Sequence, residues 1–87
     1  MDTSSIDSFR EKLDKEYEWP SLYTFKFIVP KDKAGEIRSL FQNHDIVEKP
    51  SSQGKYLSLT SKVMAQSSDK IIEIYIEASK VEGVISL

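Results

Sequence analysis

The residues from Lys49 to Tyr56 are the stretch of the chain whose types and spacing best suit ligand chemistry. They read Lys-Pro-Ser-Ser-Gln-Gly-Lys-Tyr, so two serines and a glycine lie between two lysines. Hydroxyls, turn amides and ammonium groups can together hold an anion such as a phosphate or a carboxylate. The structural alternative is that Pro50 ends one strand, the serines bond locally, and Gly54 supplies a positive φ for a hairpin. The glycine spacing and the following helix of a P-loop are both missing, and we favour the structural interpretation.

Catalytic and metal-binding chemistry finds little support elsewhere in the sequence. The chain has no cysteine and one histidine, His44, which we expect to be a solvated loop residue. The acidic residues Asp14, Glu16 and Glu18 lie in a segment that reads as an exposed helix, whereas acid–base catalysis needs carboxylates in a cleft. The serines occur without the Gly-x-Ser-x-Gly pattern of a nucleophile elbow. We therefore expect a protein that is not an enzyme and that holds no metal and no cofactor.

Size and charge limit the remaining functions. At 87 residues the chain has room for one hydrophobic core, and a domain this small gains useful burial from a partner or a second copy. Its 12 basic and 14 acidic residues are interspersed without a basic run, which disfavours nucleic-acid binding. The start lacks the features of a signal peptide, and no apolar run approaches the ~20 residues of a membrane span. We expect a cytoplasmic protein whose partner is a protein or a small-molecule effector, with a homodimer as one alternative.

An amphipathic helix is predicted over residues 4–18, where apolar residues recur at helical spacing. Ser4 or Ser5 is the expected N-cap. The pair Trp19-Pro20 ends the helix, because the residue before a proline avoids helical backbone angles. The chain is therefore expected to consist of a helical extension and one domain, at residues 1–18 and 19–87.

The predicted domain begins with a strand at residues 22–29, which alternates between two faces. Its aromatic face is the expected core side and consists of Tyr23, Phe25, Phe27 and Val29. The elements that follow are a loop with Asp32 as a cap, a helix ending near His44, strands at 45–49 and 56–65, a helix capped by Ser67-Ser68-Asp69 and ended by Gly83, and a strand at 84–87. This βαββαβ order predicts an α+β ferredoxin-like plait, in which two helices cover one face of an antiparallel sheet.

The sheet face away from the helices is the predicted surface with the most functional interest. RNA-recognition domains of this topology stack bases on aromatic residues of that face, and Tyr56 is the one aromatic candidate here. Ile28 and Met64 among polar residues suit protein contact instead, or a cover formed by the N-terminal helix. We predict protein contact, and the alternative is an RNA-binding adaptor that uses Tyr56 with two lysines. The full candidate binding surface comprises Lys26, Ile28, Lys49, Ser51, Ser52, Gly54, Lys55, Tyr56 and Lys62.

Three motifs carry a family resemblance: Tyr23-Thr24-Phe25-Lys26, the Lys49–Tyr56 stretch with Ser58, and the short finish at Val84–Leu87. With these, residues 19–87 resemble the YbeD-like family of small bacterial proteins of unknown function. That family is similar in fold to ACT domains, ferredoxin-like modules that bind small effectors and regulate metabolic enzymes.

The resemblance implies a regulatory role without naming a ligand, and an inference from fold is an analogy. The loop from Val29 to Ile37 loosely resembles the ACT ligand loop. In that loop a proline directly precedes a glycine, whereas here Pro30 lies several residues before Gly35. The leading hypothesis is therefore a non-enzymatic binding or regulatory module, acting through the open sheet face or through the Pro30–Gly35 loop.

Overall fold

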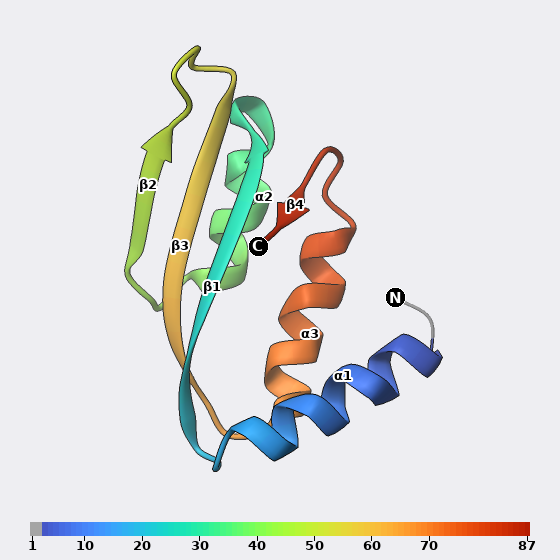
Figure 1. Cartoon of the computed structure of the whole chain (residues 1–87). Helices are drawn as coiled ribbons and strands as arrows, with labels where there is room; N and C mark the ends of the chain where they lie inside the picture. The colour runs from blue at the N-terminus through green and yellow to red at the C-terminus, as the bar shows by residue number, and fades with distance from the viewer. Residues whose placement is uncertain (1–2) are drawn as a thin grey trace.

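Strand β1 pairs with β3 along its whole length and so organises the sheet. In a computed structural model that describes residues 3–87, the register runs from Ser21 opposite Ala65 to Pro30 opposite Tyr56. Four strands form one antiparallel sheet in the order β2-β3-β1-β4 (Figure 1). The strands are β1 (Ser21–Pro30), β2 (Ile46–Pro50), β3 (Tyr56–Ala65) and β4 (Ile85–Ser86).

The helices lie on one side of this sheet and leave the other side open (Figure 1). In the chain, one helix follows the first strand and another follows the third strand. The N-terminal helix packs against the last helix. The bounds are α1 (Thr3–Glu16), α2 (Ala34–Arg38) and α3 (Ser68–Ser79), with 3-10 turns η1 (Lys31–Lys33) and η2 (Ser39–Phe41) around α2. The fold is therefore α+β, as the sequence predicted.

Aromatic rings from β1 fill the space between the sheet and the helices. Phe25, Phe27 and Val29 have no exposed surface, which confirms the predicted core face of this strand. The Phe25 ring has its centroid 4.8 Å from that of Tyr23, 5.2 Å from Tyr75 and 5.5 Å from Phe41. Because side chains alternate along a strand, one face of β1 is buried while the other meets solvent.

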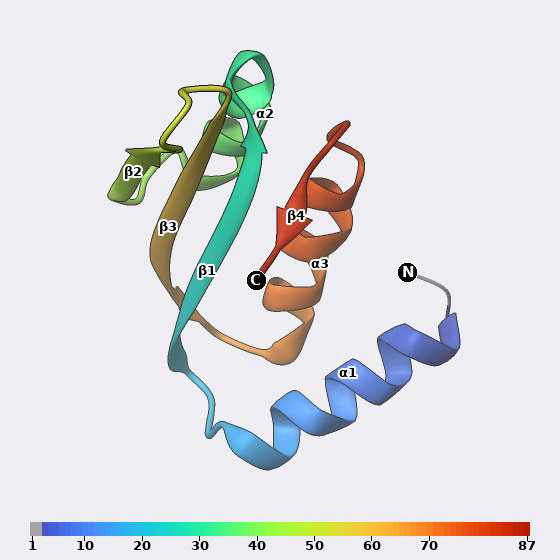
Figure 2. The ribbon, with the colours of Figure 1, turned by 45° about the horizontal axis from the view of Figure 1, so that its top comes forward.

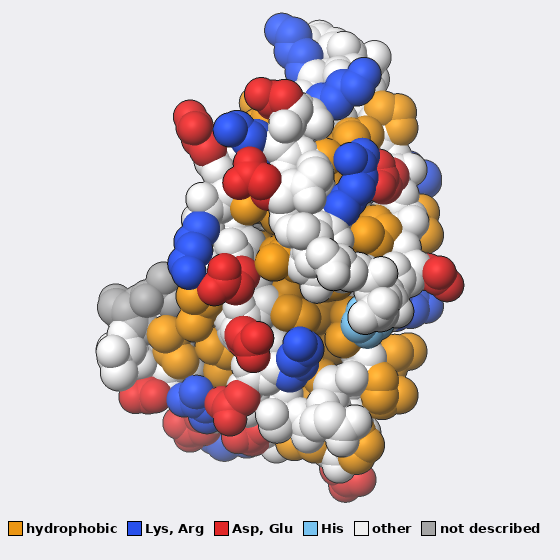
Figure 3. All heavy atoms as spheres, turned by 180° about the vertical axis from the view of Figure 1, so that it is seen from behind, with side chains coloured by type: hydrophobic (Ala, Val, Ile, Leu, Met, Phe, Trp, Pro, Cys, Tyr) orange, Lys and Arg blue, Asp and Glu red, His pale blue; other side chains and the backbone are white. Residues whose placement is uncertain are grey.

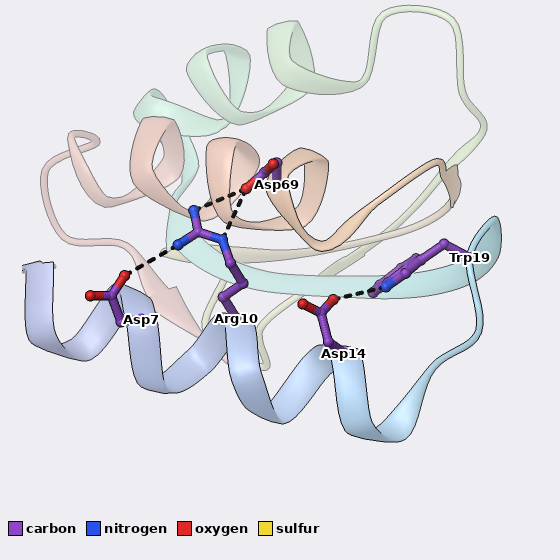
Figure 4. Close-up of polar contacts among 5 residues, drawn as sticks. All are labelled: Asp7, Arg10, Asp14, Trp19 and Asp69. Atoms are coloured by element: carbon purple, nitrogen blue, oxygen red, sulfur yellow. Dashed lines mark hydrogen bonds and ion pairs between the residues drawn. The ribbon is translucent and has the colours of Figure 1, made fainter.

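Helix α1 docks on α3 rather than over the sheet (Figure 2). Leu13 is buried in the shared core, and the Phe9 ring meets that of Tyr75 edge to face at 5.5 Å. Figure 4 shows Arg10 reaching Asp69 in the first turn of α3, with Nε and Nη2 at 3.0 and 2.9 Å from Oδ1. Exposed ion pairs contribute little, so the apolar contacts carry most of the docking energy. The alternative that this helix covers the open face is therefore wrong.

Several predicted helix ends differ in the structure. Helix α1 already includes Ser4 and Ser5, so neither is an N-cap. Asp32 lies inside η1 and makes no capping hydrogen bond, and Ser67 takes the N-cap position of α3 without a side-chain cap bond. Helix α3 ends at Ser79, four residues before Gly83, whose positive φ of 80° serves the turn into β4 instead.

The hydroxyl of Tyr75 makes the fold less stable at alkaline pH. It lies 3.0 Å from the hydroxyl of Tyr23. Burial, and next the hydrogen bond to Tyr23, raise the pKa of Tyr75 well above its ordinary value of 10. A raised folded-state pKa gives stability that is complete below the unfolded pKa and is lost as the pH rises beyond it.

We therefore expect the free energy of unfolding to fall above about pH 10. Tyr75→Phe cannot ionise, so it should flatten this fall, at a cost of about 1 kcal/mol at neutral pH for the lost hydrogen bond. Urea unfolding at several pH values measures both effects. Tyr56→Phe, at an exposed tyrosine, is the control, and an equal alkaline loss of stability in the wild type and in Tyr75→Phe would contradict the argument.

Candidate binding surface on the open face of the sheet

The open face is the side of the sheet that the helices leave uncovered. Strand register arranges its side chains in rows, with Leu22 beside Met64 and Thr24 beside Lys62. Further along β1, Ile28 lies between Ser58 of β3 and Ile85 of β4. The face comprises Leu22, Thr24, Lys26, Ile28, Val47, Lys49, Tyr56, Ser58, Thr60, Lys62, Met64 and Ile85.

Exposed apolar side chains gather on the open face. Of the described residues, six large hydrophobic ones are strongly exposed, and five of these belong to the face. Leu87, the sixth, follows β4 directly. Scattered exposed apolar residues are ordinary, but the location of five of the six on one face favours that face as a contact surface. The five are Leu22, Val47, Tyr56, Met64 and Ile85.

Lysines are the charged side chains of the open face. Lys26, Lys49 and Lys62 come from three different strands and are all exposed. Among the residues of the four strands, all of them described, the one carboxylate is Glu48. It bonds to Arg38 of α2 through two contacts of 2.7 and 2.8 Å, which place it on the helix side. Asp45, one residue before β2, lines a hollow with Lys62 at the margin of the face. The open face thus has more basic than acidic side chains, although the whole chain has a net charge of −2.

The helix side has a different charge pattern. Figure 3 shows acidic and basic side chains interspersed over that side of the molecule. Ion pairs join many of them, such as Lys15 with Glu11 and Lys80 with Glu77. The open face differs in that its strand side chains include three lysines and no carboxylate, so a partner there would gain from carrying acidic groups.

Four of the predicted site residues meet at one end of the open face. Ile28, Lys49, Ser51 and Tyr56 line a hollow of about 280 Å³ together with Pro50 and Ser58. The turn itself is tied internally. The Tyr56 amide donates to Ser51 Oγ at 3.2 Å, and the Gly54 amide donates to the Ser51 carbonyl at 2.9 Å. These bonds, with a φ of 74° at Gly54, support the structural interpretation of the turn over an anion cradle.

The other predicted site residues are spread around this hollow. Ser52 and Lys55 are exposed in the turn, and the Lys55 carbonyl accepts the Lys31 amide at 3.0 Å. Lys26 and Lys62 lie further along the sheet, and Lys62 lines a separate hollow of about 530 Å³ with the exposed His44. The structure therefore groups the candidates into one basic, partly apolar face and does not gather them into a single cleft.

The Pro30–Gly35 loop borders a third hollow, of about 450 Å³, on the helix side of the molecule. Asp32 and Lys33 line it from the loop, and Glu82 and Gly83 line it from the turn before β4. Backbone from two sequence-distant turns therefore meets here, with charges of both signs. Sequence reasoning identified the loop but not the opposite wall, because the two turns are about fifty residues apart in sequence.

Sequence reasoning left Leu22, Val47 and Ile85 out of the candidate surface. Strand alternation places Leu22 on the face of Lys26, so this signal was available in the sequence. Ile85 joins the face only through the register of β4 against β1. The basic character was also missed, because the lysines come from separate strands and form no run in the sequence.

Residues 3–87 contain neither a cluster of candidate metal ligands nor a helix that could span a membrane. No group of three or more histidine, cysteine, aspartate or glutamate side chains in this range could hold a metal ion. None of the described helices is long and apolar enough to cross a lipid bilayer.

Comparison with known proteins bears out the family resemblance. No curated protein and no solved structure matches the chain. Residues 14–87 match the model of a family described as protein of unknown function, DUF493. The match begins within α1 and includes every strand and the whole of α3. The chain is therefore a member of the DUF493 family of YbeD-like proteins.

Proposed function

We propose that this protein is a non-enzymatic binding module that contacts a protein partner through the open face of its sheet. The observation that carries the proposal is the coincidence of exposed apolar side chains and three lysines on one face. Such a face suits a partner surface in which acidic side chains surround apolar ones. The RNA alternative is weaker, because Tyr56 is the one aromatic ring that this face offers for base stacking.

The proposal extends to a regulatory role of the ACT type. The strand order β2-β3-β1-β4, with helices on one face, supports a ferredoxin-like plait, the architecture of ACT domains. Fold alone does not specify function, so this part rests on analogy. The hollow beside the Pro30–Gly35 loop supports a second candidate, a small effector with both an amino and an acidic group. NMR titration with amino acids tests it, and unchanged amide signals at residues 31–35 would refute it.

Photo-crosslinking in the native cells tests the protein-contact proposal. A photoreactive residue at Met64 lies on the open face, and one at the exposed Glu73 of α3 lies on the helix side as its control. We expect a protein crosslink from position 64 and none of that size from position 73. An RNA-containing crosslink, or equal crosslinking from the two positions, would overturn the proposal.

Charge reversal gives a matched pair of variants for the same assay. Lys26→Glu with Lys62→Glu should reduce the crosslink from position 64 at least tenfold, because the lysines would no longer attract acidic groups. Lys12→Glu with Lys70→Glu makes the same change in net charge on the helices and should leave the crosslink unchanged. All four lysines are exposed, so thermal unfolding should show both variants folded.

A further inference from the structure

One edge of β1 lacks a partner strand over half its length. All ten residues of β1 pair with β3 on one side, but only Phe27 and Ile28 pair with β4 on the other. Figure 2 shows β4 beside the C-terminal half of β1 only. The stretch from Ser21 to Phe25 therefore forms an edge of the sheet next to the open face.

The backbone groups at this edge can be assigned from two hydrogen bonds. The Lys31 amide donates to Lys55 on the β3 side, and the Leu87 amide donates to the Lys26 carbonyl on the β4 side. Residues of a strand alternate in the direction of their N–H and C=O groups. Both groups of Leu22 and of Thr24, and the N–H of Lys26, therefore point outward, and no hydrogen bond joins them to residues 3–87.

An apolar hollow of about 250 Å³ lies at the same edge, on the helix side. Phe9 of α1, Tyr75 and Ser79 of α3, and Ser86 of β4 line it. Ser86 pairs with Phe27, and the Tyr75 ring lies 5.2 Å from that of Phe25, so the hollow adjoins the unpaired part of β1. An apolar cavity of about 150 Å³ accommodates benzene, so this hollow has room for a leucine or phenylalanine side chain.

The open-face side of this edge is basic. Lys26 follows the unpaired stretch, and Lys62 lies opposite Thr24. A strand added at the edge would alternate its side chains between the lysines on one face and the hollow on the other. Acidic side chains suit the first position and a large apolar side chain suits the second.

We propose that the free edge of β1 binds an extended segment of a partner protein as an added antiparallel strand, with an apolar side chain in the hollow and acidic side chains beside Lys26 and Lys62. This is the β-augmentation mode of peptide recognition, in which backbone hydrogen bonds supply affinity and side-chain pockets supply specificity. The inference rests on the proposed function and identifies the chemistry of the partner.

A synthetic peptide, acetyl-Glu-Leu-Glu-Leu-Glu-Leu-amide, tests the inference by NMR titration with the full chain. Residues opposite each other in antiparallel strands share a face, so the peptide residues hydrogen-bonded to Leu22 and Thr24 must be the glutamates. N-methylation of the glutamate amides should abolish binding. The leucine amides point away from β1, so their N-methylation removes no hydrogen bond to β1 and should change the affinity by less than about threefold.

Amide exchange locates the bound peptide on the protein. In the free protein, Leu22 and Thr24 should exchange quickly, while Tyr23 and Phe25, bonded to β3, are protected. The peptide should protect Leu22 and Thr24. Absence of any shift at millimolar peptide, or equal binding of the two methylated peptides, would overturn the inference. Protection that grows with protein concentration alone would also overturn it, by showing a second copy at this edge.

Two serine variants test the hollow. Ser79→Phe fills it and should weaken peptide binding at least tenfold. Ser39→Phe is the matched control, because each serine is exposed and donates its hydroxyl to the carbonyl three residues earlier, at 2.6 Å for Ser79 and 2.7 Å for Ser39. If the peptide fails to bind while the crosslink from position 64 persists, the inference is wrong and the proposed function stands.

Discussion

Phe25→Ala is expected to lower the free energy of unfolding by about 3–5 kcal/mol, the usual cost of removing a buried phenylalanine. The Phe25 ring has no exposed surface and lies within 6.2 Å, centroid to centroid, of the rings of Tyr23, Phe27, Phe41 and Tyr75. The neighbouring backbone of β1 is fixed by β3, so the cavity cannot close easily. At roughly 0.05–0.15 kcal/mol per residue, the whole domain is expected to be stable by only about 4–13 kcal/mol.

Urea unfolding followed by circular dichroism measures this loss. Leu22→Ala is the control, three residues earlier in the same strand and 52% exposed on the open face, and it should cost less than about 1 kcal/mol. If the two substitutions cost the same, β1 would not be buried on one face, and the two-layer arrangement would be wrong.

Gly83→Ala has the second largest expected effect, a loss of about 2–4 kcal/mol. Gly83 has a φ of 80°, where an alanine pays about 1–2 kcal/mol. A Cβ there would also lie 2.8 Å from Cγ and 3.1 Å from Cδ of Pro30. The proline ring is rigid and follows directly on the buried Val29, so the turn before β4 must shift, at a further cost of the order of 1 kcal/mol or more.

Alanine substitutions at two other glycines separate the backbone cost from the cost of the contact with Pro30. Gly54→Ala has a φ of 74° with no atom within 4 Å of the new Cβ, so it should show the backbone cost alone, about 1–2 kcal/mol. Gly35→Ala lies in α2 with equally open surroundings and should stabilise the protein by about 0.5–1 kcal/mol. Thermal and urea unfolding of the three variants gives the order of their stabilities. A loss of stability in Gly83→Ala no larger than that in Gly54→Ala would refute the close contact with Pro30.

Parts of the fold were predictable because local patterns alone determine them. The alternation in β1 identified Phe25 and Phe27 as core residues, since the side-chain period of a strand is two. The Gly54 turn was predictable because few residues other than glycine take a positive φ at low cost. The strand at residues 56–65 was predicted with the bounds that the structure shows.

Helix ends were less predictable, because tertiary contacts override weak capping preferences. The segment predicted as one helix after Asp32 is a short α2 between two 3-10 turns. In α3, the sequence pattern continues to Gly83, but the helix ends at Ser79 and Val81 is still buried beyond it. The chain after the helix therefore still packs on the core through Val81.

The sequence by itself determined which side chains of each strand share a face, because backbone geometry alternates them whatever the strand's neighbours are. Only the tertiary structure decided which strands lie side by side, and therefore that three lysines from separate strands form one basic face. It also placed α1 on α3 and left half of one β1 edge unpaired beside the hollow lined by Phe9 and Tyr75. These features join residues far apart in the chain, and the free energy that selects such long-range contacts comes from the packing of the whole core rather than from any local pattern.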